Sequence, residues 1–185
     1  MGKIQVIKTH IPGLCIIEPT VHGDHRGYFM EVYNQEDFRA AGIEAVFVQD
    51  NQSLSVKGTL RGLHFQKKHP QGKLVRVLSG RVFDVAVDLR KSSPTFGKWY
   101  GIELSGENKK QFYIPEGFAH GFLVLSETAE FSYKCTDFYH PEDEGGLVWN
   151  DSTVGICWPE LSDGIDLILS EKDRNLPTLK DTFYF

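Results

Sequence analysis

Apolar and polar residues alternate with a period of two along much of the chain, which is the pattern of half-buried β-strands. The clearest alternation covers residues 81–89, and together with residues 75–78 and the Ser79-Gly80 pair it predicts a β-hairpin. Further strands are predicted over residues 98–104, 111–114, 122–125 and 129–136. On the second arm of the predicted hairpin two sets of side chains take opposite faces: Phe83, Val85, Val87 and Leu89 alternate with Val82, Asp84, Ala86 and Asp88.

Helical signals are few. Residues 34–41 predict one short helix, because Asn34 can cap it and Gly42 can end it. Residues 170–175 predict a single helical turn before Pro177. Short strands separated by Gly, Pro and Ser favour a sandwich or barrel over βαβ units. The predicted fold is therefore mainly β, an antiparallel β-barrel or jelly roll with a few short helices, in one domain of 185 residues.

Composition narrows the class of protein. The chain is 41% hydrophobic and 24% charged, which is ordinary for a globular protein. Its net charge of −5 argues against binding to nucleic acid or to a membrane surface. No run of about 18 apolar residues would form a transmembrane helix, and residues 1–6 lack the apolar core of a signal peptide. We therefore expect a cytoplasmic protein.

The cysteines are odd in number and have no C-x-x-C spacing: Cys15, Cys135 and Cys157. A disulfide framework or a zinc ribbon is therefore not expected. We expect all three side chains to be buried free thiols.

The candidate chemistry centres on His64, in the run Arg61-Gly62-Leu63-His64-Phe65-Gln66, with Lys73 a few residues later. A lone histidine is often only a buried side chain bonded to a backbone carbonyl. Several polar groups directed into one small barrel, however, would be costly to bury without a ligand. A histidine base beside a lysine cation suits proton abstraction next to a carbonyl, because the ammonium can stabilise the enolate oxygen.

The segment from Pro115 to Phe122 has the pattern P-x-G-x-x-H, which resembles the second signature of the cupin superfamily of small β-barrels. In metal-binding cupins the first signature supplies two histidines and a glutamate. Here Gln66 stands at the second histidine position, and no glutamate occupies the corresponding place before Gly80. His120 therefore lacks its usual partners, and we expect no metal site. Neither a G-x-G-x-x-G motif nor a P-loop is present, so no nicotinamide or ATP site is expected.

Two further positions leave alternatives open. Tyr133 shares a strand face with Phe131 and Cys135, which is compatible with an aromatic core strand or with a phenol that acts as a general acid. Ser170 and Asp173 have the spacing of a helix cap. On spacing alone the cap is favoured over a role for Asp173 as a partner of His64.

Motifs over nearly the whole chain, each weak alone, form a specific series. They are Asp24-x-Arg26-Gly27-x-Phe29-x-Glu31, Gln49-Asp50-Asn51, Arg61 to Gln66, Gly72 to Arg76, Pro115 to Phe122, Tyr133-Lys134-Cys135-Thr136 with Tyr139, Glu144-Gly145-Gly146, Trp149-Asn150-Asp151 and Ser170-x-Lys172-Asp173. In this series the chain resembles the dTDP-4-dehydrorhamnose 3,5-epimerase family, whose members take part in dTDP-L-rhamnose synthesis.

The resemblance implies a homodimeric cupin, without metal or cofactor, that converts dTDP-4-dehydro-6-deoxy-D-glucose, a dTDP-4-keto-6-deoxyhexose, to dTDP-4-dehydro-L-rhamnose. It assigns four catalytic roles: His64 as base, Asp173 as its partner, Lys73 as the cation at the enolate oxygen and Tyr133 as the acid on the opposite face. It also implies a substrate shell formed by Arg26, Glu31, Gln49, Asp50, Asn51, Arg61, His120, Tyr139, Glu144 and Lys172.

In that family each barrel receives residues from its partner's N-terminal region. The N-terminal arm, residues 1–20, has strand-like apolar spacing and no core of its own. We therefore expect it to pair with the sheet of a neighbouring subunit.

Other functions remain compatible with the sequence. They are a C5-only or C3-only epimerase, a 3,4-ketoisomerase, a metal-dependent cupin oxygenase and a non-catalytic cupin that binds a sugar nucleotide. Tyr133 favours an epimerase, because inversion requires a proton donor on the face opposite the base. His64 argues against a protein that only binds.

Overall fold

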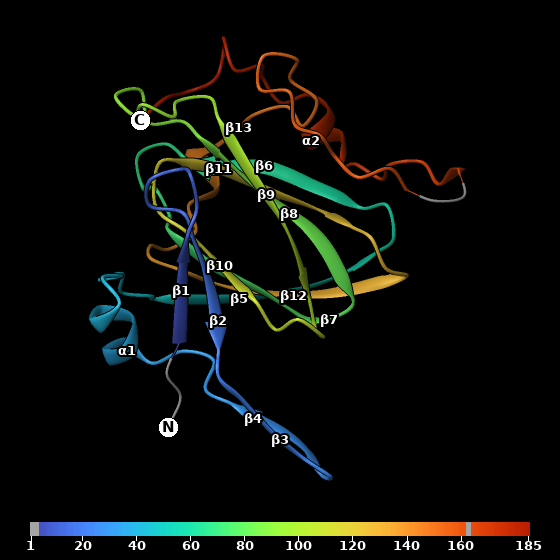
Figure 1. The fold of residues 1–185 in the computed structure, drawn as a ribbon. Coiled ribbons are helices and arrows are strands. Elements are labelled where there is room, and N and C mark those ends of the chain that lie inside the picture. Colours follow the sequence, from blue (N-terminus) through green and yellow to red (C-terminus); the bar gives the residue numbers. More distant parts are fainter. Residues whose placement is uncertain (1–3, 162–163) are drawn as a thin grey trace.

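The computed structural model describes residues 4–161 and 164–185, and two antiparallel sheets facing each other form its body (Figure 1). One sheet has six strands in the order β1 (Ile4–Lys8), β2 (Cys15–Pro19), β10 (Gln111–Ile114), β7 (Lys73–Ser79), β12 (Thr128–Cys135) and β5 (Gln49–Val56). The other has five, in the order β13 (Glu144–Gly146), β6 (Leu60–Gln66), β11 (Phe118–Val124), β8 (Arg81–Asp88) and β9 (Trp99–Ser105). The predicted mainly β, cupin-like fold is confirmed.

Smaller elements surround this body. Strands β3 (Val21–Asp24) and β4 (Gly27–Met30) form a separate hairpin that extends away from both sheets (Figure 1). Both predicted helices are confirmed as α1 (Gln35–Ala40) and α2 (Glu171–Arg174), and a 3₁₀ turn, η1, covers Pro141–Asp143. Asn34 caps α1, its Oδ1 accepting a hydrogen bond from the Glu36 backbone N–H at 2.9 Å. None of the helices in the described part of the chain is long and apolar enough to cross a membrane.

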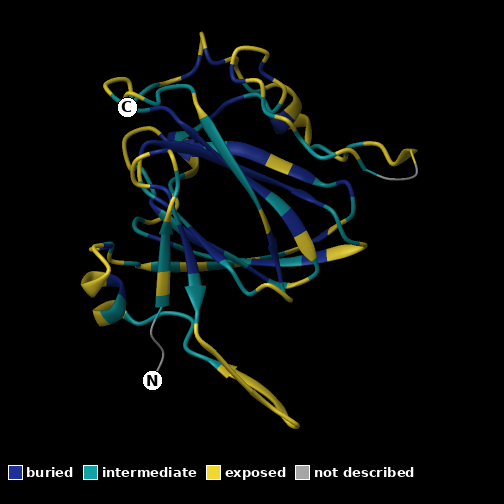
Figure 2. Cartoon of the chain, in the orientation of Figure 1, coloured by how far each residue is buried: buried dark blue, intermediate teal, exposed yellow. Residues whose placement is uncertain are grey.

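The central strands of the five-stranded sheet, β11 and β8, are buried on both faces (Figure 2). On β8, Val82 and Ala86 pack into the core between the sheets, and Val85 and Val87 pack into a second cluster with Leu147 of the C-terminal segment. Every residue of β11 is buried for the same reason. Polar side chains on the inner face of these strands are therefore shielded from solvent.

The predicted hairpin at residues 75–89 is wrong. Strand β7 pairs with β10 and β12, whereas β8 pairs with β9 and β11, so the chain crosses from one sheet to the other at the turn. The turn itself needs glycine: Gly80 has φ +76°, and a Cβ there would lie 2.0 Å from the Thr128 carbonyl oxygen. A two-residue turn does not determine whether the two strands that it joins pair with each other. Here the packing of the core determines that they belong to different sheets.

The N-terminal arm forms the edge of a sheet of its own chain, and its pairing with a neighbouring subunit stays a prediction. Strand β1 pairs with β2, and β2 pairs with β10 of the same chain, so the arm extends its own sheet. Residues 1–3 of the arm lie outside the described residues.

The remaining strands confirm the predictions, with small shifts. Residues 111–114 have the predicted bounds, while β11 begins at Phe118, four residues before the predicted start. The expectation for the cysteines holds for Cys135, which is buried, but Cys15 is half-buried and Cys157 is exposed. Residue 157 lies in a part of the C-terminal segment that forms no helix or strand.

Candidate active site

A cavity of about 330 Å³ opens between the two sheets beside α2. Its wall contains seven residues that the sequence predicted: Arg61, His64, Lys73, His120, Tyr133, Lys172 and Asp173. The remaining lining residues are Ser53, Gly121, Phe122, Phe131 and Ser170. One cavity thus joins residues from five strands and one helix.

His64 and Asp173 form a hydrogen-bonded pair in this cavity. The Nε2 atom of His64 lies 2.5 Å from Oδ1 of Asp173, although the two residues are 109 positions apart. Burial opposes ionisation of Asp173, but hydrogen bonds from His64 and Ser170 hold its pKa below the ordinary value. The aspartate is therefore a carboxylate that accepts from Nε2–H, which leaves Nδ1 of His64 free to take a proton.

Local structure explains how this pair forms. Ser170 caps α2, its Oγ accepting from the Asp173 backbone N–H at 3.1 Å, so the cap and the partner of His64 coexist. On β6, Gly62 (φ +109°) allows a close approach to β11, because a Cβ there would lie 2.6 Å from the His120 carbonyl oxygen. His64 is then the register partner of His120, and both side chains line the cavity.

Lys73 supplies a cation at the start of β7. Burial lowers the pKa of its ammonium, and the charges of Cys135, Asp84 and Glu144 oppose that shift. Among the described residues the ammonium of Lys73 has no hydrogen-bond or ion-pair partner, so an oxygen of a bound substrate would be a direct partner.

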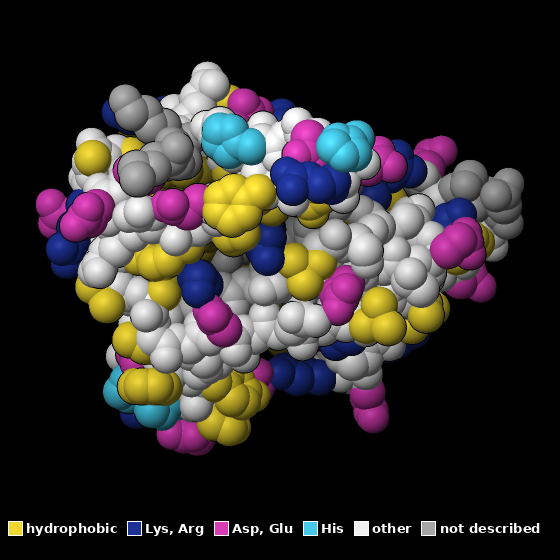
Figure 3. All heavy atoms as spheres, turned by 90° about the horizontal axis from the view of Figure 1, so that it is seen from below, with side chains coloured by type: hydrophobic (Ala, Val, Ile, Leu, Met, Phe, Trp, Pro, Cys, Tyr) yellow, Lys and Arg dark blue, Asp and Glu magenta, His cyan; other side chains and the backbone are white. Residues whose placement is uncertain are grey.

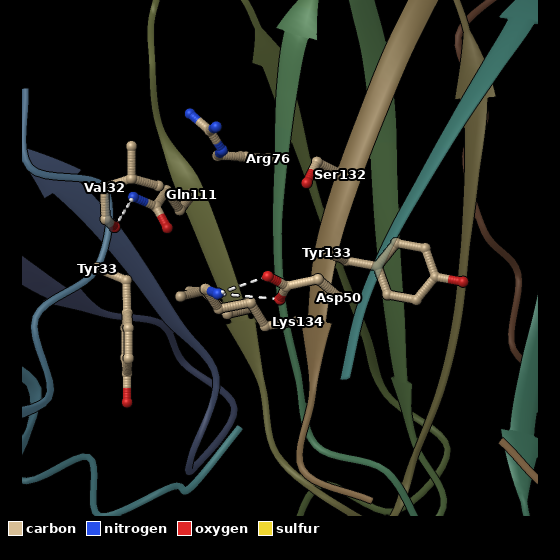
Figure 4. Close-up of a pocket in the computed structure, with 9 residues that line it drawn as sticks. Val32, Tyr33, Asp50, Arg76, Gln111, Ser132, Tyr133 and Lys134 are labelled. Carbon is tan, nitrogen blue, oxygen red and sulfur yellow. Dashed lines mark hydrogen bonds and ion pairs between the residues drawn. The ribbon is translucent and has the colours of Figure 1, made fainter. Parts of the chain in front are cut away.

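Tyr133 enters the cavity from β12. Figure 4 shows its ring directed away from Arg76 and Lys134, which lie on the outer face of the sheet. Burial raises the pKa of the Tyr133 phenol, so it remains protonated at neutral pH. A protonated phenol in a cavity that also holds a base can act as a general acid.

Four other predicted residues lie near the cavity but outside its lining, namely Gln49, Asn51, Tyr139 and Glu144. Glu144 is paired at 2.5 Å with Lys172, which lines the cavity. Burial raises the pKa of Tyr139, and its hydrogen bond to Glu144 acts in the same direction. The Oε1 atom of Gln49 accepts from the Tyr139 backbone N–H at 3.0 Å, and its Nε2 donates to Asn51 at 3.0 Å.

Three predicted residues are not brought to this cavity. Asp50 lies on the outer face of the six-stranded sheet, where it pairs with Lys134 at 2.9 Å (Figure 4). Arg26 is exposed on the β3–β4 hairpin and pairs with Asp24 at 2.5 Å. Glu31 follows this hairpin, and its Oε1 is buried without a hydrogen-bond partner.

Gln66, which stands at a cupin ligand position, connects two loops. Its Nε2 donates to the carbonyl oxygens of His69 at 2.7 Å and Phe138 at 3.0 Å, and its Oε1 accepts from the His140 backbone N–H at 2.7 Å. Its whole amide is therefore occupied away from the cavity. Within residues 4–161 and 164–185, no three His, Cys, Asp or Glu side chains are grouped so that they could hold a metal ion.

Sequence reasoning missed Asp84, which lies against His120. The signal was a charged residue that shares a strand face with Val82 and Ala86, but period-two alternation assigned it no role. Ser53 was missed because a serine in a strand carries no distinguishing signal.

Comparison with known proteins gives the same family as the motifs. The family described as dTDP-4-dehydrorhamnose 3,5-epimerase matches residues 8–181. The chain belongs to this epimerase family. The dTDP-4-dehydrorhamnose 3,5-epimerase of Methanothermobacter thermautotrophicus is 57% identical over 98% of this chain and 97% of its own.

Solved structures of family members have the same fold. The dTDP-4-dehydrorhamnose 3,5-epimerase of Elizabethkingia anophelis is 58% identical, with a TM-score of 0.91 over 96% of this chain and 97% of that one. The dTDP-6-deoxy-D-glucose-3,5-epimerase of Legionella pneumophila, in complex with dTDP-4-keto-L-rhamnose, is 53% identical, with a TM-score of 0.92 over 96% of this chain and 94% of that one.

Proposed function

We propose that this chain is an isomerase that converts dTDP-4-dehydro-6-deoxy-D-glucose to dTDP-4-dehydro-L-rhamnose by inverting C3 and C5. The observation that carries the proposal is the presence of a histidine–carboxylate pair, an unpaired lysine and a protonated tyrosine in one cavity. The Legionella relative supports the substrate class, because its structure contains dTDP-4-keto-L-rhamnose.

The first step is removal of a proton next to the C4 ketone. Nδ1 of His64 takes the proton from C3 or C5, and Asp173 stabilises the imidazolium that forms. The electron pair of the C–H bond moves toward the carbonyl oxygen and gives an enolate. The Lys73 ammonium stabilises this charge most strongly when the charge has fully developed.

The second step returns a proton to the same carbon from the opposite face. The Tyr133 phenol donates it, and the enolate collapses to the ketone with inverted configuration. His64 then loses its proton to solvent, Tyr133 regains one, and the cycle repeats at the other carbon. Arg61 and Lys172 supply cations in the cavity wall, and a guanidinium can bind a diphosphate through two hydrogen bonds.

Proton NMR of dTDP-4-dehydro-6-deoxy-D-glucose with the enzyme in D₂O tests the function. We expect deuterium at both C3 and C5 and formation of the L-rhamno product. Deuterium at one carbon alone would instead indicate a C3-only or C5-only epimerase, and a product with its ketone at C3 would indicate a 3,4-ketoisomerase.

The pH dependence of turnover tests Lys73. Because burial lowers the pKa of Lys73, its cation is present below that pKa and is lost as the pH rises through it. We expect kcat to fall along this alkaline limb. Lys73→Arg retains the charge, so its limb should lie at higher pH even if its maximal rate is lower. An identical alkaline limb in Lys73→Arg and wild type would show that another group titrates.

We further propose that the enzyme is a homodimer in which the β3–β4 hairpin completes the partner's site. Phe29 on the hairpin is 71% exposed and Leu54 on the outer face of β5 is 66% exposed, although both are large and apolar. Figure 3, which views this side of the molecule, shows hydrophobic side chains gathered in patches on it. The hairpin also carries Arg26, a predicted substrate ligand that lies outside the cavity of its own chain.

Light scattering should therefore give twice 21.0 kDa, or about 42 kDa. A mixing experiment tests the contribution of Arg26. Arg26→Ala and His64→Asn should each be inactive alone. Their equilibrated equimolar mixture should regain roughly a quarter of wild-type activity, since half of the dimers are mixed and one of the two sites in each of these is intact. A fully active monomer at micromolar concentration, or no regain on mixing after subunit exchange, would contradict the proposal.

A further inference from the structure

Asp84 is a buried carboxylate that the proposed reaction does not use. It lies on β8, is 0% exposed and shares the inner face of that strand with Val82 and Ala86. Both of its carboxylate oxygens lie 3.0 Å from Nε2 of His120, which lines the cavity. The side chain therefore lies directly behind the cavity wall.

Its hydrogen bonds differ from those of the other buried carboxylate on the same strand. Asp88, also 0% exposed, accepts hydrogen bonds from the side chains of Arg90, Ser93 and Thr95 and from the Arg90 backbone. Among the described residues, the carboxylate of Asp84 has His120 as its only hydrogen-bond partner. A buried carboxylate is costly unless it is compensated, so the compensation of Asp84 must extend beyond one imidazole.

Lys73 is the second group whose charge favours the ionised form of Asp84. Burial raises the pKa of Asp84, and its interactions with His120, which include a hydrogen bond, and the charge of Lys73 oppose that shift. Burial lowers the pKa of His120, so this imidazole is neutral at neutral pH even though Asp84 favours its charged form. A neutral His120 that donates from Nε2 to Asp84 has only Nδ1 left, as an acceptor.

The groups of this cluster and those that face it come from six strands. Lys73 is acted on by Cys135 of β12, Asp84 of β8 and Glu144 of β13, and His120 is acted on by Asp84, Lys73 and His64. Burial raises the pKa of the Cys135 thiol, so it is neutral at neutral pH, and Glu144 is already paired with Lys172. Among these described groups, Asp84 is the acidic side chain left to balance the charge of Lys73.

We propose that Asp84 is a positioning residue that keeps Lys73 cationic and fixes His120 as the Nε2–H tautomer, whose Nδ1 accepts a hydrogen bond from a substrate hydroxyl. The role in turnover rests on the proposed epimerase function. The electrostatic coupling of Asp84 to Lys73 does not, because it exists in the free protein.

Asp84→Asn tests both roles, because the amide oxygen can accept the same hydrogen bond from His120 while the charge is removed. We expect the alkaline limb of kcat to move to lower pH by about one unit, the scale of losing a nearby opposite charge. In the ligand-free protein, NMR of lysine labelled with ¹³C at Cε should show the same shift for Lys73. Affinity for dTDP, which lacks the sugar, should change less than about twofold, since the cluster would face the sugar.

Asp88→Asn is the matched control. It should lower the melting temperature, because three side chains and one backbone N–H lose a charged acceptor, and should leave both the alkaline limb and the Lys73 titration unchanged. An Asp84→Asn protein with an unshifted Lys73 titration would overturn the proposal. If Asp84→Asn does not fold, Asp84→Ser carries the same expectation.

The wild-type protein provides an independent check. Asp84 must be ionised over the pH range in which the enzyme works, and ¹³C NMR of labelled aspartate carboxyls measures this directly. A protonated Asp84 in that range would contradict the proposal. If wild type catalyses no exchange in D₂O, the proposed function fails, whereas the Lys73 titration still decides the role of Asp84.

Discussion

His64→Asn lowers the rate of deuterium exchange at both C3 and C5 by about 10²-fold or more, the usual scale for loss of a general base. Asparagine is similar in size to histidine and can donate to Asp173, so the cavity should keep its shape. It has no group that can take a proton near neutral pH. Because the histidine interacts with the reacting carbon mainly in the transition state, kcat should fall while affinity for dTDP changes little.

A second histidine, close to His64 in the sequence, is the control. His69 follows β6 by three residues, and its side chain is about half exposed and lies near Asp137 at 3.7 Å. His69→Asn should retain wild-type exchange at both carbons. If His64→Asn also retained near wild-type exchange, His64 would not be the base, and the pair with Asp173 would be structural.

Tyr133→Phe separates exchange from inversion. Removing the phenol hydroxyl leaves the ring packing with Phe131 almost unchanged, but it removes the proton donated to the face opposite His64. Deprotonation by His64 should continue, so deuterium from the solvent should still enter at one or both carbons. The yield of inverted product should fall sharply, by about 10²-fold or more. Proton NMR in D₂O measures exchange and product in one experiment.

A purely structural tyrosine would behave differently. Loss of one hydrogen bond would change stability by about 1 kcal/mol and leave the stereochemistry of the product intact. Tyr113→Phe is the matched control, because Tyr113 is a half-buried tyrosine of the same sheet, on β10, and packs into a cluster away from the cavity. If Tyr133→Phe gave the doubly inverted product at the normal rate, another acid would be required.

The sequence by itself determined most local elements of this protein. Period-two alternation predicted the strands, and Asn34 and Ser170 predicted the starts of both helices, because these signals act within a few residues. The cluster from Arg61 to Lys73 was also visible, because a strand fixes which side chains share a face. The family followed from motifs in order and spacing, which need no coordinates.

Only the tertiary structure decided which strands pair and which distant residues meet. At Gly80 the chain changes sheets, and no local signal distinguishes that crossover from a hairpin turn. Spacing alone favoured Asp173 as a cap, and only the family resemblance made it the partner of His64, until the fold placed its carboxylate 2.5 Å from that histidine. The sequence did not indicate that Asp84 is buried, because alternation along a strand suggests that one face is exposed. In the structure both faces of β8 are covered. Such contacts depend on the packing of whole layers, which is a property of the entire chain rather than of any short segment.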